Sequence, residues 1–112
     1  MASTFRNLLT SGIGTVHTSP VLTTTGNSAK TTVIGLSLSN TTSDIVRASI
    51  QLNDTLSSTS AYYMKDVLIP PNQSLRVING GEKLILTSSI QIFVWSTVDN
   101  SLDLVMSFVE IT

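Results

Sequence analysis

The sequence offers few side chains that could carry out chemistry. His17 is the only histidine and the chain has no cysteine, which excludes a multi-histidine or thiolate metal site. A Ser-His-Asp triad would have to use His17, which lies in a polar, Thr-rich stretch. Asp99 and Asp103 flank an expected turn and could bind a hard cation, although solvation of that loop is the better explanation. We therefore predict a protein that is not an enzyme and uses no cofactor.

Charge and composition narrow the range of partners. Six Lys and Arg oppose seven Asp and Glu, so the formal charge of −1 provides no positive field for nucleic acid. No apolar run approaches the roughly 18 residues that a membrane span needs. Met1–Leu9 lacks the basic and apolar regions of a secretion signal, so we expect no export. Neither nucleic acid nor a membrane is expected as a partner.

From residue 33 onward, the sequence has the pattern of short strands separated by turns. Runs of Ile, Val, Leu and Thr alternate with clusters of Gly, Pro, Asn and Ser. The runs 34–39 and 46–53 alternate in polarity, and their expected inward positions are Ile34, Leu36, Leu38, Val46, Ala48, Ile50 and Leu52. Because the turn cluster 40–44 separates these two runs, we predict that they form a β-hairpin.

The remaining runs complete an all-β domain. Strands are expected at 61–69, 82–87, 90–97 and 102–111, with a shorter apolar run at 75–77. Pro70 and Pro71 end the first of these, because proline has no N–H to donate to a neighbouring strand. Seven or eight strands at this spacing predict an antiparallel β-sandwich or jelly roll.

The N-terminal residues 1–30 are expected to differ from the sandwich domain at 31–112. The stretch 10–32 is mostly Ser, Thr, Gly and Asn and buries little. A short strand at Ile13–Thr18 followed by a long loop is the favoured interpretation, because Thr and β-branched residues favour strands. The alternative is an extended arm that becomes ordered only against a neighbouring subunit.

The last two expected strands carry apolar side chains on both faces. Their inward positions are Ile90, Ile92, Val94, Leu102, Leu104, Met106 and Phe108, which leaves further apolar residues facing outward. A monomeric sandwich should present polar residues there. Strand ends, the N-terminal segment or a different register would explain this without a partner, and a subunit interface is the alternative. The candidate interface residues are Phe93, Trp95, Val105, Val109, Ile111, Tyr62 and Tyr63.

Three stretches carry a resemblance to a known class of protein. They are VIGLSLSNTT at 33–42, the tyrosine-bearing stretch with its proline-led turn and Gly-Gly turn at 61–89, and LVMSFVEI at 104–111. Together they resemble the small β-sandwich virion structural proteins of tailed bacteriophages. The Thr-rich N-terminal third has no counterpart in that resemblance.

The resemblance implies a binding role within a virion assembled in the host cytoplasm. The expected function is capsid decoration, in which a cement protein bridges major capsid subunits and forms a homo-oligomer, with a trimer as one form. A neck, tail, baseplate or fibre-attachment subunit is the alternative within the same class. From a different class, a carbohydrate-binding module at the host surface would use Tyr62, Trp95 and Asp99.

Overall fold

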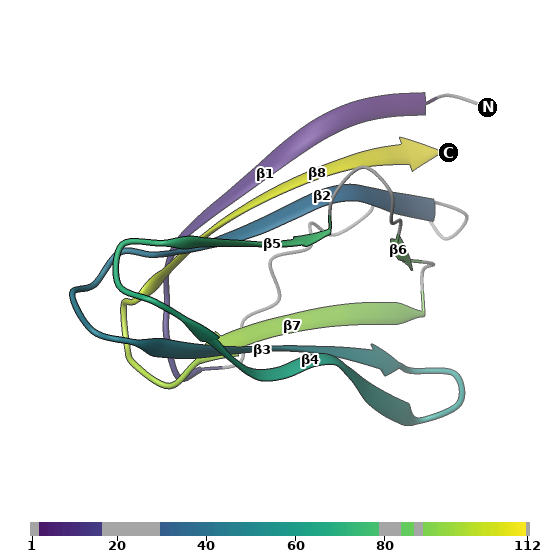
Figure 1. Ribbon diagram of the computed structural model, residues 1–112. Coiled ribbons are helices and arrows are strands. Elements are labelled where there is room, and N and C mark those ends of the chain that lie inside the picture. The colour runs from purple at the N-terminus through teal and green to yellow at the C-terminus, as the bar shows by residue number, and fades with distance from the viewer. Residues whose placement is uncertain (1–2, 17–29, 79–83, 87–88, 112) are drawn as a thin grey trace.

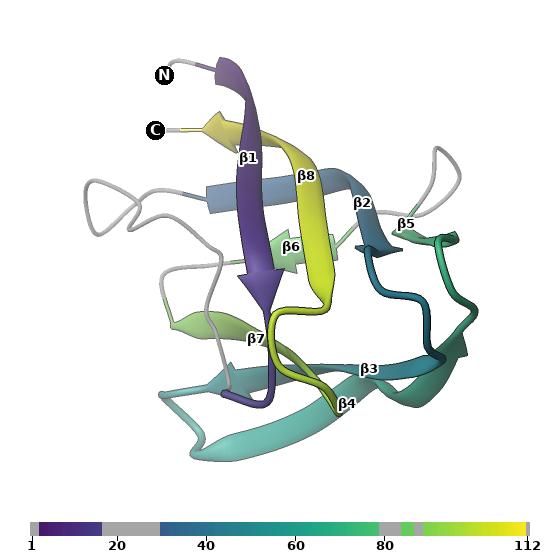
Figure 2. The ribbon, with the colours of Figure 1, turned by 90° about the vertical axis from the view of Figure 1, so that its left-hand side faces the viewer.

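Within the residues that the structure describes, eight strands form two antiparallel sheets that pack face to face (Figures 1 and 2). The computed structural model describes residues 3–16, 30–78, 84–86 and 89–111. The strands are β1 (Ser3–Ile13), β2 (Lys30–Asn40), β3 (Val46–Asp54), β4 (Thr59–Ile69), β5 (Ser74–Ile78), β6 (Leu84–Leu86), β7 (Ile90–Ser96) and β8 (Leu102–Ile111). This architecture confirms the predicted all-β sandwich.

The strand pairing follows the winding of a jelly roll. One sheet has the order β1-β8-β2-β5, with β6 pairing along the same edge of β2 as β5, and the other has the order β4-β3-β7. In sequence order, the paired strands β3 and β4 lie between the strands of the next pairing, which joins β2 to β5 and β6. The pair β1–β8 lies outside both of these pairings in the sequence. Such nested antiparallel pairs are one long hairpin rolled into two layers, which is how a jelly roll closes.

The predicted hairpin between the runs 34–39 and 46–53 is wrong. These runs lie in β2 and β3, which belong to different sheets. Residues 41–45 carry the chain across the edge of the sandwich. The same alternation suits both arrangements, because each strand buries one face against the opposite layer.

Hydrogen bonds from Asn40 secure this crossover. Its side chain is buried, and its amide Nδ2 donates to the carbonyl oxygens of Asp44, Ile69 and Pro70 at 2.8, 3.0 and 3.2 Å. The amide Oδ1 accepts from the backbone N–H and the hydroxyl of Thr42 at 2.9 and 2.7 Å. One side chain therefore joins the end of β2 to the end of β4 in the other sheet.

The core confirms most of the predicted alternation. The inward residues of β3, β7 and β8 are buried or pack against the core as expected, and the buried apolar residues are Ile13, Val33, Leu36, Leu38, Val46, Ala48, Ile50, Ile69, Ile78, Leu86, Ile92, Val94, Leu102, Leu104, Met106 and Phe108. The inward assignment of Ile34 is wrong. The register of β2 against β8 shifts between Val33 and Gly35, so Ile34 is an extra residue in a bulge and Val33 fills the core instead.

The first strand lies earlier than the sequence predicted. β1 ends at Ile13, where the sequence analysis expected a strand to begin, and residues 17 and 18 lie outside the described residues. β1 pairs with β8 of the same chain, from Ser3 opposite Ile111 to Ile13 opposite Leu102. The described N-terminal segment is therefore an edge strand of the sandwich.

Replacing Asn40 with Ala should lower the free energy of unfolding by about 1–3 kcal/mol, because buried carbonyl groups lose their donor. Chemical denaturation of the variant and the parent measures the change. Ser43→Ala, at an exposed position in the same connection, is the control and should stay within about 0.5 kcal/mol of the parent. Equal stability of the two variants would contradict the structural role of Asn40.

Candidate functional site

The outer face of the β1-β8-β2 sheet, which points away from the opposite layer, carries a group of apolar side chains among polar ones. The buried residues of β8 alternate with Val105, Ser107 and Val109, which therefore point outward. The strand registers place Leu9 beside Val105 and Phe5 beside Val109. We call Phe5, Leu9, Ile34, Ile85, Val105 and Val109 the apolar face.

Much of the apolar face is open to solvent in a single chain. Phe5 is 75% exposed, Leu9 is 72% exposed and Val105 is 43% exposed. Ile85 of β6 is also exposed, and Ile34 and Val109 are half-buried. Exposed apolar side chains that stand singly need no explanation, but a row of them across neighbouring strands indicates a binding surface.

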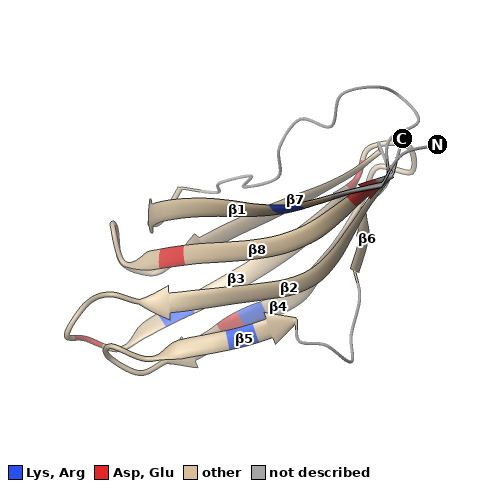
Figure 3. Cartoon of the chain, turned by 90° about the horizontal axis from the view of Figure 1, so that it is seen from above, with Lys and Arg blue, Asp and Glu red and all other residues tan. Residues whose placement is uncertain are grey.

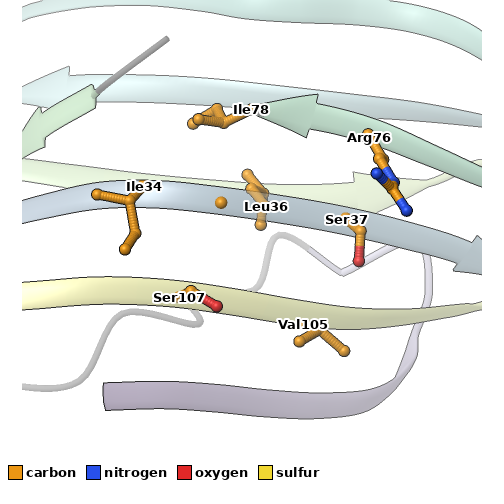
Figure 4. Close-up of a pocket in the computed structure, with 8 residues that line it drawn as sticks. Ile34, Leu36, Ser37, Arg76, Ile78, Val105 and Ser107 are labelled. Atoms are coloured by element: carbon orange, nitrogen blue, oxygen red, sulfur yellow. The ribbon is translucent and has the colours of Figure 1, made fainter. Parts of the chain in front are cut away.

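The described residues of this sheet form shallow hollows, three of which border the apolar face. One of about 280 Å³ is lined by Ile34, Gly35, Leu36, Ser37, Arg76, Ile78, Val105 and Ser107, and Figure 4 shows these side chains around it. A second of about 300 Å³ lies between Phe5 and Ile34. A third of about 420 Å³ lies between Leu9 and Val105. The face therefore has both exposed apolar groups and recesses between them.

Few charged positions interrupt this sheet. Figure 3 views it from outside, and the ribbon is mostly tan. Arg6 faces the inner side, where its Nε lies 3.3 Å from the Glu110 carboxylate. Arg76 lines one end of the first hollow, and Asp103 lines the third. The chemistry of the apolar face suits a protein surface better than a charged ligand.

The outward position of Val105 and Val109 agrees with the sequence analysis. The structure also shows whether the N-terminal segment covers these two residues. β1 lies beside β8 in the same sheet and does not cover its outer face. It extends that face by adding Phe5 and Leu9. The side chain of Ile111 lies outside the described residues. The interface role of these residues stays a prediction.

The outer face of the β4-β3-β7 sheet carries the aromatic candidates. Tyr62, Gln51 and Phe93 stand opposite one another on three strands. The Tyr62 and Trp95 rings meet edge to face, with centroids 5.9 Å apart and planes at 64°. Tyr62 is 47% exposed and Tyr63 is 37% exposed, whereas Phe93 and Trp95 are half-buried. The interface role of these four residues likewise stays a prediction.

The same geometry bears on the carbohydrate alternative. Two rings at 64° form no shared flat surface on which a sugar could stack. Asp99, the acid expected to take part, accepts hydrogen bonds from the N–H and the hydroxyl of Thr15 at 3.0 and 2.7 Å. Its carboxylate therefore already has a structural role.

Asp103 and Asp99 anchor the end of β1 and the residues that follow it. Asp103 Oδ1 accepts from the Gly12 N–H at 3.2 Å, and the two Thr15 donors lower the pKa of Asp99, the hydroxyl having the larger effect. Within the part of the chain that the structure describes, no group of three or more potential ligand residues gathers to hold a metal ion. The described ranges also contain no helix long and apolar enough to span a membrane.

Sequence reasoning missed Phe5, Leu9 and Ile85. Phe5 and Leu9 lie in the N-terminal segment 1–30, where the only strand expected was Ile13–Thr18, and Ile85 faces outward between the two inward residues of β6. A spacing of four residues between Phe5 and Leu9 was the available signal, because positions separated by an even number share a strand face. Comparisons of the chain with protein families, curated proteins and solved structures find no match.

Replacing Thr15 with Ala should raise the pKa of Asp99 towards its ordinary value of 3.8, because the stronger of its two donors is lost. Since the folded pKa is depressed, this contact stabilises the fold above about pH 3.8, and the contribution is lost as the pH falls through the lower folded value. Titration of the side-chain carboxyl by NMR measures the change.

Asp54 provides an internal control for this titration. Its pKa is lowered mainly by a hydrogen bond from the Leu56 N–H, which the substitution leaves in place. The pKa of Asp54 should therefore be the same in both proteins. An unchanged pKa of Asp99 in the variant would show that the Thr15 hydroxyl does not hold this carboxylate.

Proposed function

We propose that this chain is a non-enzymatic structural protein of a tailed-phage virion and that it decorates the capsid. The observation that carries the proposal is the apolar face of the β1-β8-β2 sheet, where Phe5 and Leu9 are about three-quarters exposed. The stretches 33–42, 61–89 and 104–111 resemble small virion proteins, and this resemblance indicates that the assembly is a virion. A partner that covers this face is a protein with apolar groups of its own.

The proposed mechanism is burial across a junction. The apolar face lies over the boundary between two major capsid subunits, and side chains from both enter the hollows beside Ile34 and Val105. Covering Phe5 and Leu9 contributes about 1–2 kcal/mol each. Because the bound protein contacts both subunits, separating them requires its release, and the shell withstands a higher internal pressure. Many identical copies multiply this modest effect.

Self-association is part of the proposal. A decoration protein binds a symmetric surface, and copies that also contact one another gain effective concentration once the first has bound. A neck, tail, baseplate or fibre-attachment subunit would use the same apolar face. The experiment below separates these positions on the particle.

Purified protein should co-sediment with undecorated heads of the phage that encodes it. Val105→Lys and Ile85→Lys each place a charge on the apolar face and should weaken binding by about tenfold or more, because a buried unpaired charge costs at least 1.4 kcal/mol. Leu68→Lys, at an exposed position on the other sheet, is the matched control and should bind like the parent.

Two results would contradict the decoration proposal. Binding to tails without binding to heads assigns the protein to the tail or neck instead. Binding to heads that is insensitive to both substitutions on the apolar face removes that face from the mechanism.

A further inference from the structure

We infer that two copies of this chain pair edge to edge through β1, antiparallel about a twofold axis at Asn7. Their β1-β8-β2 sheets then form one continuous sheet. The inference rests on the self-association included in the proposed function and names its geometry. A twofold pair takes the place of the trimer considered from the sequence.

The free edge of β1 is a ready template for another strand. β1 is 11 residues long and pairs with β8 in an uninterrupted register from Ser3 to Thr10. Among the described residues, no strand pairs with its other edge. A sheet edge presents backbone N–H and C=O groups that can bond to a further strand.

Among the described strands, β4, β5 and β6 are less suited to edge pairing, and β7 is covered at its end. The register of β4 shifts twice against β3, Asp66 adopts a φ of 49°, and Lys65 and Asp66 add charge. β5 and β6 contain 5 and 3 residues. The end of β7 is covered, because the Ser96 N–H donates to the Gly14 carbonyl at 2.8 Å. Bulges, charges and short strands are the usual means of preventing edge pairing.

β1 lacks these protections over residues 3–10. This segment contains no proline, and its single charged residue is Arg6. The Arg6 guanidinium is neutralised by Glu110 of the same chain at 3.3 Å. Two copies can therefore approach along this edge without unpaired like charges.

The side chains of β1 are self-complementary about Asn7. Opposite residues of a continued sheet must share a face, so a twofold axis has to pass through a residue position. With the axis at Asn7, Phe5 stands opposite Leu9 of the second copy, and Leu9 stands opposite Phe5. Because β8 places Val109 beside Phe5 and Val105 beside Leu9, each row becomes apolar across four strands.

Neighbouring registers lack this match. An axis at Arg6 places Phe5 opposite Asn7, and an axis at Leu8 places Leu9 opposite Asn7. At the preferred register, the two Asn7 side chains meet at the axis, and each accepts a hydrogen bond from its own Ser107 hydroxyl at 2.6 Å. This symmetric pattern of apolar, polar and apolar residues favours a second copy as the occupant of the edge.

A charge-exchange experiment at position 7 tests the pairing in the absence of capsids. Light scattering should give the parent a mass twice that of the 12.0 kDa chain. Asn7→Lys and Asn7→Glu each place like charges directly opposite at the axis and should weaken the dimer by about tenfold or more. An equimolar mixture of the two variants should restore it. Leu56→Lys, at a highly exposed loop position, should leave the dimer unchanged.

Cysteine cross-linking tests the register. The chain has no native cysteine, so Asn7→Cys should form a disulfide-linked dimer on mild oxidation. Leu9→Cys alone should not, because Leu9 faces Phe5 of the second copy, whereas a mixture with Phe5→Cys should cross-link. Circular dichroism confirms that each variant is folded.

A monomeric or trimeric parent overturns the inference, as does a dimer that neither charge at position 7 weakens. Its failure is distinguishable from failure of the proposed function. If the Asn7→Lys variant is monomeric and still binds heads, the result supports pairing through β1, and the decoration proposal stands. A dimeric parent that binds no phage particle contradicts only the decoration proposal.

Discussion

β8 is the strand on which the rest of the structure depends, because it carries apolar side chains on both faces. Its inward residues Leu104, Met106 and Phe108 fill the core, and its outward Val105 and Val109 lie between β1 and β2 on the surface. A central strand that buries only one face normally alternates with polar residues. Here the second face remains partly open in a single chain, so the same strand that holds the sandwich together also contributes to the proposed binding surface.

Much of the fold could be predicted because the period of two is clear in β3, β7 and β8. Two features of the fold could not be predicted from this alternation. The bulge at Ile34 changes which residue faces inward, and a bulge leaves no mark in polarity alone. The crossover after Asn40 resembles a hairpin in sequence, because a short polar connection suits either path. Its true course depends on hydrogen bonds to Ile69 and Pro70, which lie far along the chain.

Only some residues of the apolar face could be predicted from the sequence. Val105 and Val109 could be found because they interrupt an otherwise regular alternation at the end of the chain. Phe5 and Leu9 had only their spacing as a signal, because β1 mixes polar and apolar residues on both faces and is a strand chiefly through its pairing with β8. Tertiary pairing, and not local preference, brings the two ends of the chain together into one face.

The central claim is that a second molecule covers the apolar face. Covalent side-chain footprinting of Phe5, Leu9 and Val105 tests it most directly, with Leu56 as an exposed reference and the protein compared in dilute solution and bound to phage heads. We predict that labelling of the three residues falls on binding while that of Leu56 is unchanged. Equal labelling of all four residues in both states would contradict the claim.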